Sequence, residues 1–108
     1  MRVFGLSSCD TCKKAEKALR NKGLLFDVVD VRKDGVPPAD LARFHDTFGE
    51  ALLNRRSTTW RGLSDEARAG DPLALLAAHP TLMKRPVIEA DGRLYLCWDK
   101  AVQAALLG

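Results

Sequence analysis

The first 31 residues predict a strand, a helix and a second strand, which together form a βαβ unit. Residues 2–6 are apolar enough for a short strand, and a helix then opens at Cys9 or Asp10 with apolar side chains at helical spacing. Gly23 can end this helix as a left-handed cap, and the β-branched segment 24–31 follows as the second strand. Such connections are right-handed in nearly all proteins and leave the two strands parallel. The start of the chain therefore predicts an α/β fold.

The rest of the chain predicts a group of helices, then a hairpin and a final helix. Residues 37–80 carry apolar side chains at helical spacing, interrupted by a polar, arginine-bearing loop at 54–62. The Asp91–Gly92 pair stands between two alternating apolar segments, which is the pattern of a tight hairpin, and a helix follows at about 99–107. This order resembles the thioredoxin architecture, with a mixed four-stranded sheet and a helical insertion at about residues 37–80.

Length and charge narrow the class of protein. We expect residues 1–108 to form one domain, because 108 residues is the usual length of a single domain. The 17 basic and 14 acidic residues give a net charge of +3 without a dense basic stripe, so we expect no direct nucleic-acid partner. No apolar segment approaches the roughly 20 residues that span a bilayer, and three cysteines are too few for a secreted disulfide scaffold. We expect a cytoplasmic protein without a membrane partner.

The segment Cys9-Asp10-Thr11-Cys12 lies where the first strand meets the first helix. A helix start offers unpaired N–H groups and about half a positive charge, and both stabilise a thiolate. We expect this stabilisation to be largest for the thiolate of Cys9, and Lys13 adds positive charge nearby. Cys12 lies one turn further on the same face, from which it can attack a mixed disulfide formed on Cys9. This placement favours thiol–disulfide redox chemistry.

The alternative for the cysteine pair is half of a zinc site. Such a site needs two further ligands, and only His45, His79 and Cys97 remain, none at paired ligand spacing. The pattern favours redox chemistry over zinc, and we expect no metal. Cys97 lies in the last predicted strand, where it is either a small core residue or a reserve resolving thiol.

Three separated motifs make the chain resemble a known family. They are SCDTCKKA at 8–15, ALLNRRSTTW at 51–60 and HPTLMKRPVI at 79–88. In this order, and nearly end to end, the chain resembles the glutaredoxin-related arsenate reductase (ArsC) family, especially its YffB-like and Spx-like members. The resemblance implies a thioredoxin-like fold with a helical insertion and a nucleophilic cysteine at Cys9.

The resemblance also implies an oxyanion or carboxylate site. In family arsenate reductases three arginines surround the cysteine, and the one in the Arg-Pro motif matches Arg85. Pro86 then matches the proline that is cis beside the active cysteine in this fold. The fork-shaped guanidinium of Arg85 suits a carboxylate or an oxyanion.

The other two family arginines are absent from their positions here. One falls on Asn54 and the other on Trp98. The YffB-like and Spx-like pattern places its loop arginine at Arg56, with Arg55 directly before it. We expect Arg56, assisted by Arg55, Pro86 and Lys13, to complete the substrate site, and we expect poor turnover of arsenate.

The resemblance therefore implies a glutathione-linked thiol–disulfide oxidoreductase that holds no bound cofactor. Cys9 attacks as a thiolate, and Cys12 or glutathione, the co-substrate, resolves the mixed disulfide; glutaredoxin is a further candidate partner. The alternatives are a true arsenate reductase and an Spx-like redox-sensing regulator that binds RNA polymerase. Such regulators usually continue beyond the last helix with a charged tail, whereas this sequence stops at Gly108, which favours the enzyme.

Overall fold

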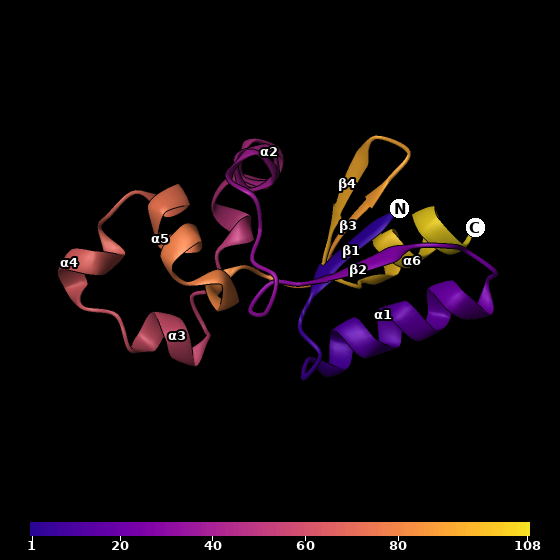
Figure 1. Cartoon of the computed structure of the whole chain (residues 1–108), viewed down its shortest axis with the longest axis horizontal. Helices are drawn as coiled ribbons and strands as arrows, with labels where there is room; N and C mark the ends of the chain where they lie inside the picture. Colours follow the sequence, from indigo (N-terminus) through magenta and orange to yellow (C-terminus); the bar gives the residue numbers. More distant parts are fainter.

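Four strands form one mixed sheet in the computed structural model, which describes all residues 1–108 (Figure 1). Their order across the sheet is β2-β1-β3-β4, with bounds β1 (Arg2–Gly5), β2 (Asp27–Asp30), β3 (Val87–Ala90) and β4 (Arg93–Leu96). Strand β1 is parallel to β2 and antiparallel to β3, and β3 is antiparallel to β4. The predicted fold class, a thioredoxin-like α/β fold, is confirmed.

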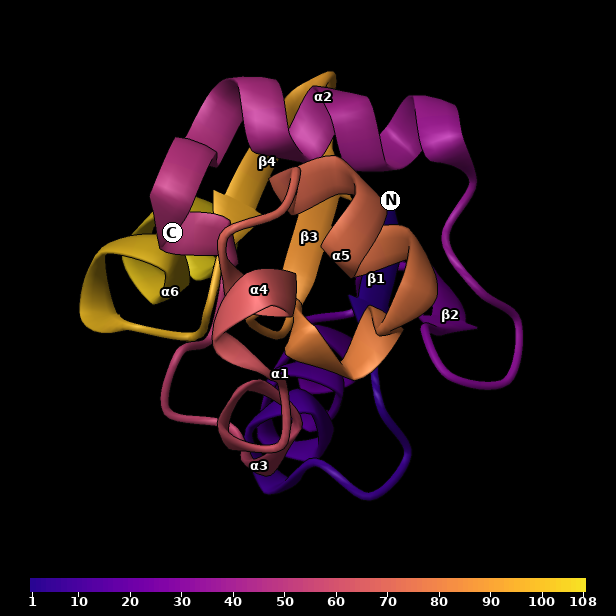
Figure 2. The same cartoon turned by 90° about the vertical axis from the view of Figure 1, so that its left-hand side faces the viewer.

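The helices fall into two groups. Between β2 and β3 the chain forms α2 (Pro38–Phe48), α3 (Thr58–Arg61), α4 (Asp65–Arg68) and α5 (Pro72–Ala78), with 3₁₀ turns η1 (Gly49–Leu52) and η2 (Pro80–Leu82). These elements make a helical lobe in front of the sheet (Figure 2). The other two helices, α1 (Asp10–Asn21) and α6 (Lys100–Leu107), lie on the side of the sheet away from this lobe (Figure 1). None of these helices is both long and apolar enough to cross a membrane.

Alternation along the strands divides the core into two apolar clusters. Val3 and Ile88 are opposite each other in the β1–β3 register, and both pack with α1 and α6. Their neighbours Phe4 and Val87, also opposite each other, pack against the helical lobe. The Phe4 ring meets that of Phe44 on α2 edge to face, with ring centroids 4.9 Å apart. The sheet is therefore buried on both faces at its centre.

The hairpin prediction is confirmed, and the second strand is shorter than predicted. Asp91 and Gly92 have φ of 51° and 77°, the left-handed values that a two-residue hairpin turn needs. The second strand covers only Asp27–Asp30 instead of 24–31, and Leu25 is 92% exposed. This strand lies at the edge of the sheet. Of the apolar side chains before it, Leu24 and Phe26 pack against the cluster beside α1 and α6, whereas Leu25 is left in solvent.

The predicted loop at 54–62 contains a short helix. Helix α3 spans Thr58–Arg61 because the Ser57 hydroxyl accepts a hydrogen bond from the Trp60 backbone N–H at 3.1 Å. The sequence pattern missed this helix because one turn is too short to show an apolar period.

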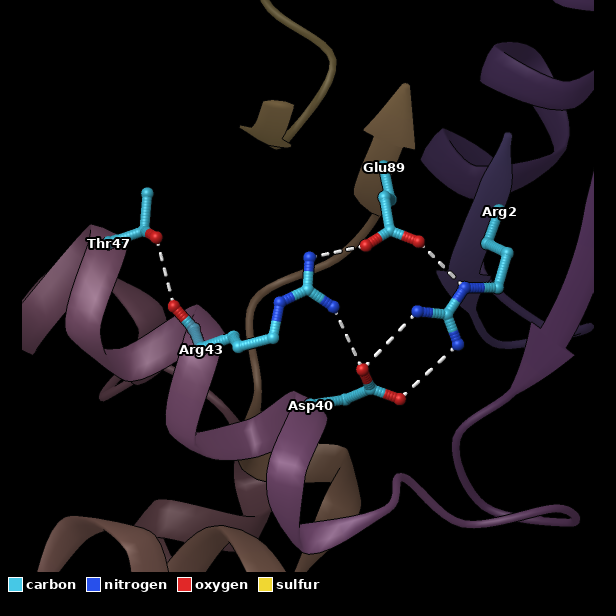
Figure 3. A network of polar contacts seen from close by, with 5 residues as sticks. All are labelled: Arg2, Asp40, Arg43, Thr47 and Glu89. Carbon is cyan, nitrogen blue, oxygen red and sulfur yellow. Dashed lines mark hydrogen bonds and ion pairs between the residues drawn. The ribbon is translucent and has the colours of Figure 1, made fainter. Parts of the chain in front are cut away.

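Four charged side chains join the helical lobe to the sheet (Figure 3). Arg2 on β1 donates to Glu89 on β3 at 2.8 Å and to Asp40 on α2 at 3.2 and 3.3 Å. Arg43, one turn along α2, donates to Asp40 at 3.0 Å and also pairs with Glu89. Thr47 is not part of this network; its hydroxyl donates to the Arg43 carbonyl one turn back in α2. Each carboxylate thus accepts from both arginines, and this network fixes α2 against β1 and β3.

The network makes stability depend on pH. Hydrogen bonds from Arg2 and Arg43 hold the pKa of Glu89 below its ordinary value. A carboxyl group with a depressed folded-state pKa stabilises the protein above its unfolded pKa, and this stabilisation is lost as the pH falls through the folded value. We expect Glu89→Gln to lower the free energy of unfolding at neutral pH by about 1–2 kcal/mol, and to lose less stability than the wild type on acidification.

Urea unfolding at neutral and acidic pH measures both effects. Glu66→Gln is the matched control, because Glu66 is exposed and makes no ion pair. Equal pH dependence in Glu89→Gln and the wild type would show that the network adds no pH-dependent stability.

Candidate active site

Cys9 lies at the N-cap of α1, directly before Asp10. Its backbone is extended, with φ −87° and ψ 116°, and its side chain is half-buried. No side chain caps this helix start. The positive end of the α1 dipole therefore lies at Cys9, and the Asp10 carboxylate in the first turn is the one acidic side chain there.

The surroundings of Cys9 favour its thiolate. Burial alone would raise the pKa of Cys9, but interactions with the backbone N–H and the thiol of Cys12 and with the Arg85 guanidinium outweigh it. The net result is a pKa of Cys9 below its ordinary value. Cys9 is thus the one of the three thiols whose pKa is lowered, so it ionises most readily.

Cys12 has the opposite properties. It is fully buried, and this burial, together with the charge of Cys9, raises the pKa of Cys12 to about 12. Gly5 on β1 provides the space for it, because a Cβ at this position would lie 2.7 Å from the Cys12 Sγ. Cys12 therefore stands behind Cys9 as a protonated thiol in a tight niche.

Arg85 reaches Cys9 from the other side of the site. Its Nη1 donates to the carbonyls of Thr81 at 2.7 Å and Met83 at 3.2 Å, so its guanidinium is held by the turn that precedes it. Its Nε is buried and has no hydrogen-bond acceptor. The Arg85–Pro86 peptide bond is cis, as the resemblance implies. A fixed cation thus lies beside the thiol.

Cys9 opens into a cavity of about 300 Å³ between the start of α1, the helical lobe and the ends of β3 and β4. The cavity is lined by Cys9, Thr11, Asn54, Lys84, Arg85 and Cys97. A second cavity of about 550 Å³ shares Asn54 and Lys84 with the first and continues to Arg55 and Arg56. The two cavities adjoin at Asn54 and Lys84; the first holds the thiols and Arg85, and the second holds Arg55, Arg56 and the Glu50 carboxylate.

Of the two predicted loop arginines, one is paired with a carboxylate and the other is not. Arg55 is paired with Glu50, and its guanidinium lies 5.6 Å from the centroid of the Trp60 ring. The Arg56 side chain is exposed and unpaired, and its backbone N–H donates to the Asn54 side chain. Arg56 is therefore the loop arginine free to meet a substrate anion.

Lys13 is not brought to either cavity. It is exposed on α1 and lines neither of them. The site has Lys84 instead, which lines both cavities and forms no ion pair. The sequence signal for Lys84 was its place directly before Arg85 in the third motif.

Cys97 lies outside the last strand, in contrast to the sequence prediction. Strand β4 ends at Leu96, and Cys97 has a φ of 66°. Its backbone N–H donates to the Pro86 carbonyl at 2.8 Å, and its half-buried side chain lines the Cys9 cavity. Sequence spacing alone could not show that the chain turns at this residue.

No group of three or more His, Cys, Asp and Glu side chains lies together as metal ligands would. His45, at the end of α2, and His79, before η2, line neither of the two cavities of the site. The arrangement at Cys9 supplies a nucleophile, a second thiol and cations for an anionic substrate.

The niche around Cys12 predicts the effect of filling Gly5. In Gly5→Ala the new methyl group meets the Cys12 Sγ, and we expect a loss of about 1–3 kcal/mol in the free energy of unfolding. Gly62→Ala is the control, since the nearest atom to its Cβ is 3.4 Å away. In the double variant Gly5→Ala/Cys12→Ala, part of the loss should be recovered, because the clashing sulfur is gone.

Denaturant unfolding of these variants checks the prediction. A Gly5→Ala protein as stable as Gly62→Ala would show that Cys12 has room to move.

Comparisons with known proteins agree with this architecture and site. The ArsC family model matches residues 4–106. An uncharacterized protein of Haemophilus influenzae is 38% identical over 109 residues, which cover 95% of this chain and 96% of that protein. The solved structure of a YffB protein has a TM-score of 0.85 at 30% identity and covers 99% of this chain and 98% of its own. An arsenate reductase (ArsC) related protein from Brucella melitensis has a TM-score of 0.71 at 36% identity, covering 95% and 91%. The chain therefore belongs to the ArsC family and is similar to its YffB-like members.

Proposed function

We propose that the protein is a glutathione-linked thiol–disulfide oxidoreductase with Cys9 as its nucleophile. The observation that carries the proposal is the pairing of a half-buried thiol of lowered pKa with Arg85 at the mouth of an open cavity. Family membership and the likeness to a protein described as arsenate reductase-related support thiol chemistry at this site.

In the first step, the Cys9 thiolate attacks a sulfur of a glutathionylated thiol. A bond forms between Cys9 Sγ and the glutathione sulfur, the substrate disulfide breaks, and the released thiolate takes a proton from water. Cys9 is then neutral, as a mixed disulfide with glutathione.

In the second step, Cys12 or a second glutathione releases the first glutathione. Attack by Cys12 on Cys9 Sγ forms an internal disulfide, and two glutathione molecules then restore both thiols. Loss of the Cys9 charge removes one of the causes that raise the pKa of Cys12, but burial, the largest cause, remains. Attack by Cys12 is therefore slow in this scheme.

The cations along the site suit the carboxylates of glutathione. Arg85 and Lys84 line the cavity of Cys9, and Arg56 lies in the adjoining cavity. Guanidinium groups bind carboxylates through paired hydrogen bonds, and an ammonium adds a point charge. In the proposal, Arg85 and Arg56 hold the two ends of the tripeptide while its sulfur lies at Cys9.

Exposure to oxidised glutathione followed by peptide mass spectrometry tests the nucleophile. We expect glutathione on Cys9, and we expect Cys9→Ser to abolish turnover of a glutathionylated peptide in an assay with glutathione, glutathione reductase and NADPH. Cys97→Ser, which alters another thiol of the same cavity, is the control and should still acquire the adduct on Cys9. Full turnover by Cys9→Ser would rule out this mechanism.

We expect arsenate to be a poor substrate. Asn54 lines the cavity where family reductases have an arginine, and Trp98 packs with the apolar cluster beside α1 and α6 where they have another. One lost donor at such a site lowers the rate by about a hundred- to a thousandfold. Assayed side by side, arsenate should be turned over at least about a hundredfold more slowly than a glutathionylated peptide. Comparable rates would show that the cations present are sufficient.

A further inference from the structure

We infer that Cys97 is a second resolving thiol, which attacks the mixed disulfide on Cys9 from within the cavity and forms a Cys9–Cys97 disulfide. This inference rests on the proposed function, because it requires a mixed disulfide on Cys9. It assigns a chemical role to a thiol that the two-cysteine motif does not include.

The first support is position. Cys97 and Cys9 line the same cavity although 88 positions separate them in the chain. The hydrogen bond from the Cys97 N–H to the Pro86 carbonyl, at 2.8 Å, holds Cys97 directly beside the Arg85–Pro86 segment. Cys97 therefore stands on the wall that the substrate faces.

The second support is that Cys97 does not act as a core residue. It belongs to neither of the two apolar clusters, whereas its neighbours Leu96 and Trp98 each pack against one of them. Its left-handed φ of 66° is uncommon for a residue other than glycine. The structure keeps this side chain at the cavity instead of in the apolar interior.

The third support is a comparison of the two available resolving thiols. Cys12 is fully buried behind Cys9, whereas Cys97 is half-buried and open to the cavity. Burial, Asp99 and the charge of Cys9 raise the pKa of Cys97, and Lys84, on the same cavity, opposes them. When Cys9 becomes a neutral mixed disulfide, its contribution disappears, so the pKa of Cys97 falls at the step in which it must attack.

The step balances without a further oxidant. The Cys97 thiol loses its proton to water, and its thiolate attacks Cys9 Sγ. The Cys9–Cys97 bond forms, the Cys9–glutathione bond breaks, and glutathione leaves as a thiolate that takes up a proton. The Cys97 sulfur is oxidised to the disulfide level while the glutathione sulfur is reduced to a thiol, and the Cys9 sulfur stays in a disulfide throughout. Two further glutathione molecules then reduce the Cys9–Cys97 disulfide and leave as oxidised glutathione.

Variants that lack Cys12 isolate this step. Cys12→Ser and Cys12→Ser/Cys97→Ser are treated with oxidised glutathione, quenched with acid at intervals, and mapped by mass spectrometry without reduction. We expect the single variant to lose glutathione from Cys9 at least tenfold faster than the double variant and to accumulate a Cys9–Cys97 disulfide. Lys84→Met in the Cys12→Ser background should slow this release.

The outcomes separate the inference from the proposed function. Equal persistence of the adduct in both variants, or no Cys9–Cys97 disulfide, would overturn the role of Cys97. A double variant that never acquires glutathione on Cys9 would instead overturn the proposed function. Because Cys12 is buried, Cys12→Ala and Cys12→Ala/Cys97→Ala form a second pair that avoids a buried hydroxyl, and circular dichroism checks that each variant is folded.

Discussion

The antiparallel pairing of β1 with β3 is the constraint on which the site depends. Phe4 on β1 pairs with Val87 on β3, and Val87 pairs on its other side with Leu96 at the end of β4. The chain leaves β1 toward Cys9, enters β3 from Arg85–Pro86 and leaves β4 at Cys97. Three segments that are far apart in the sequence therefore meet at one end of the sheet. The register alone places a nucleophilic thiol, a cation and a further thiol around one cavity.

Within this frame, burial and charge give the cysteines different chemistry. The same residue type has a lowered pKa at the helix start and a raised one a turn further on, because Cys9 meets donors and Arg85 whereas Cys12 is enclosed by the core. The helical lobe contributes the rest of the site, since Asn54 and the loop arginines come from it. The ion network that fixes α2 against β1 and β3 holds this lobe on the sheet (Figure 3).

Local patterns in the sequence predicted the parts of this structure that depend on neighbouring residues. The βαβ order, the Asp91–Gly92 turn and the helix start at Cys9 each rest on a few adjacent side chains. The truncation of β2 and the turn at Cys97 depend on partners far along the chain, and no local pattern marks them. Helix α3 has a local cap at Ser57 but is too short for its apolar spacing to predict it. The lysines show the same difference between closeness in sequence and closeness in the structure. Lys13 is near Cys9 in sequence, but Lys84 is the lysine that lines the Cys9 cavity. Gly5 had a weaker signal, as a glycine inside a strand, which indicates a close approach by another group.

The central claim is that Cys9 has a pKa below that of a free thiol because Cys12 and Arg85 stabilise the charge of its thiolate. Ultraviolet absorbance of the thiolate, followed against pH in Cys97→Ser, measures this directly, since the pKa of Cys12 is raised to about 12 and Cys12 titrates separately. The account predicts a midpoint below that of a free thiol, about 8.5, and a higher midpoint when Arg85→Met is added. A midpoint at or above the free value, unchanged by Arg85→Met, would contradict it.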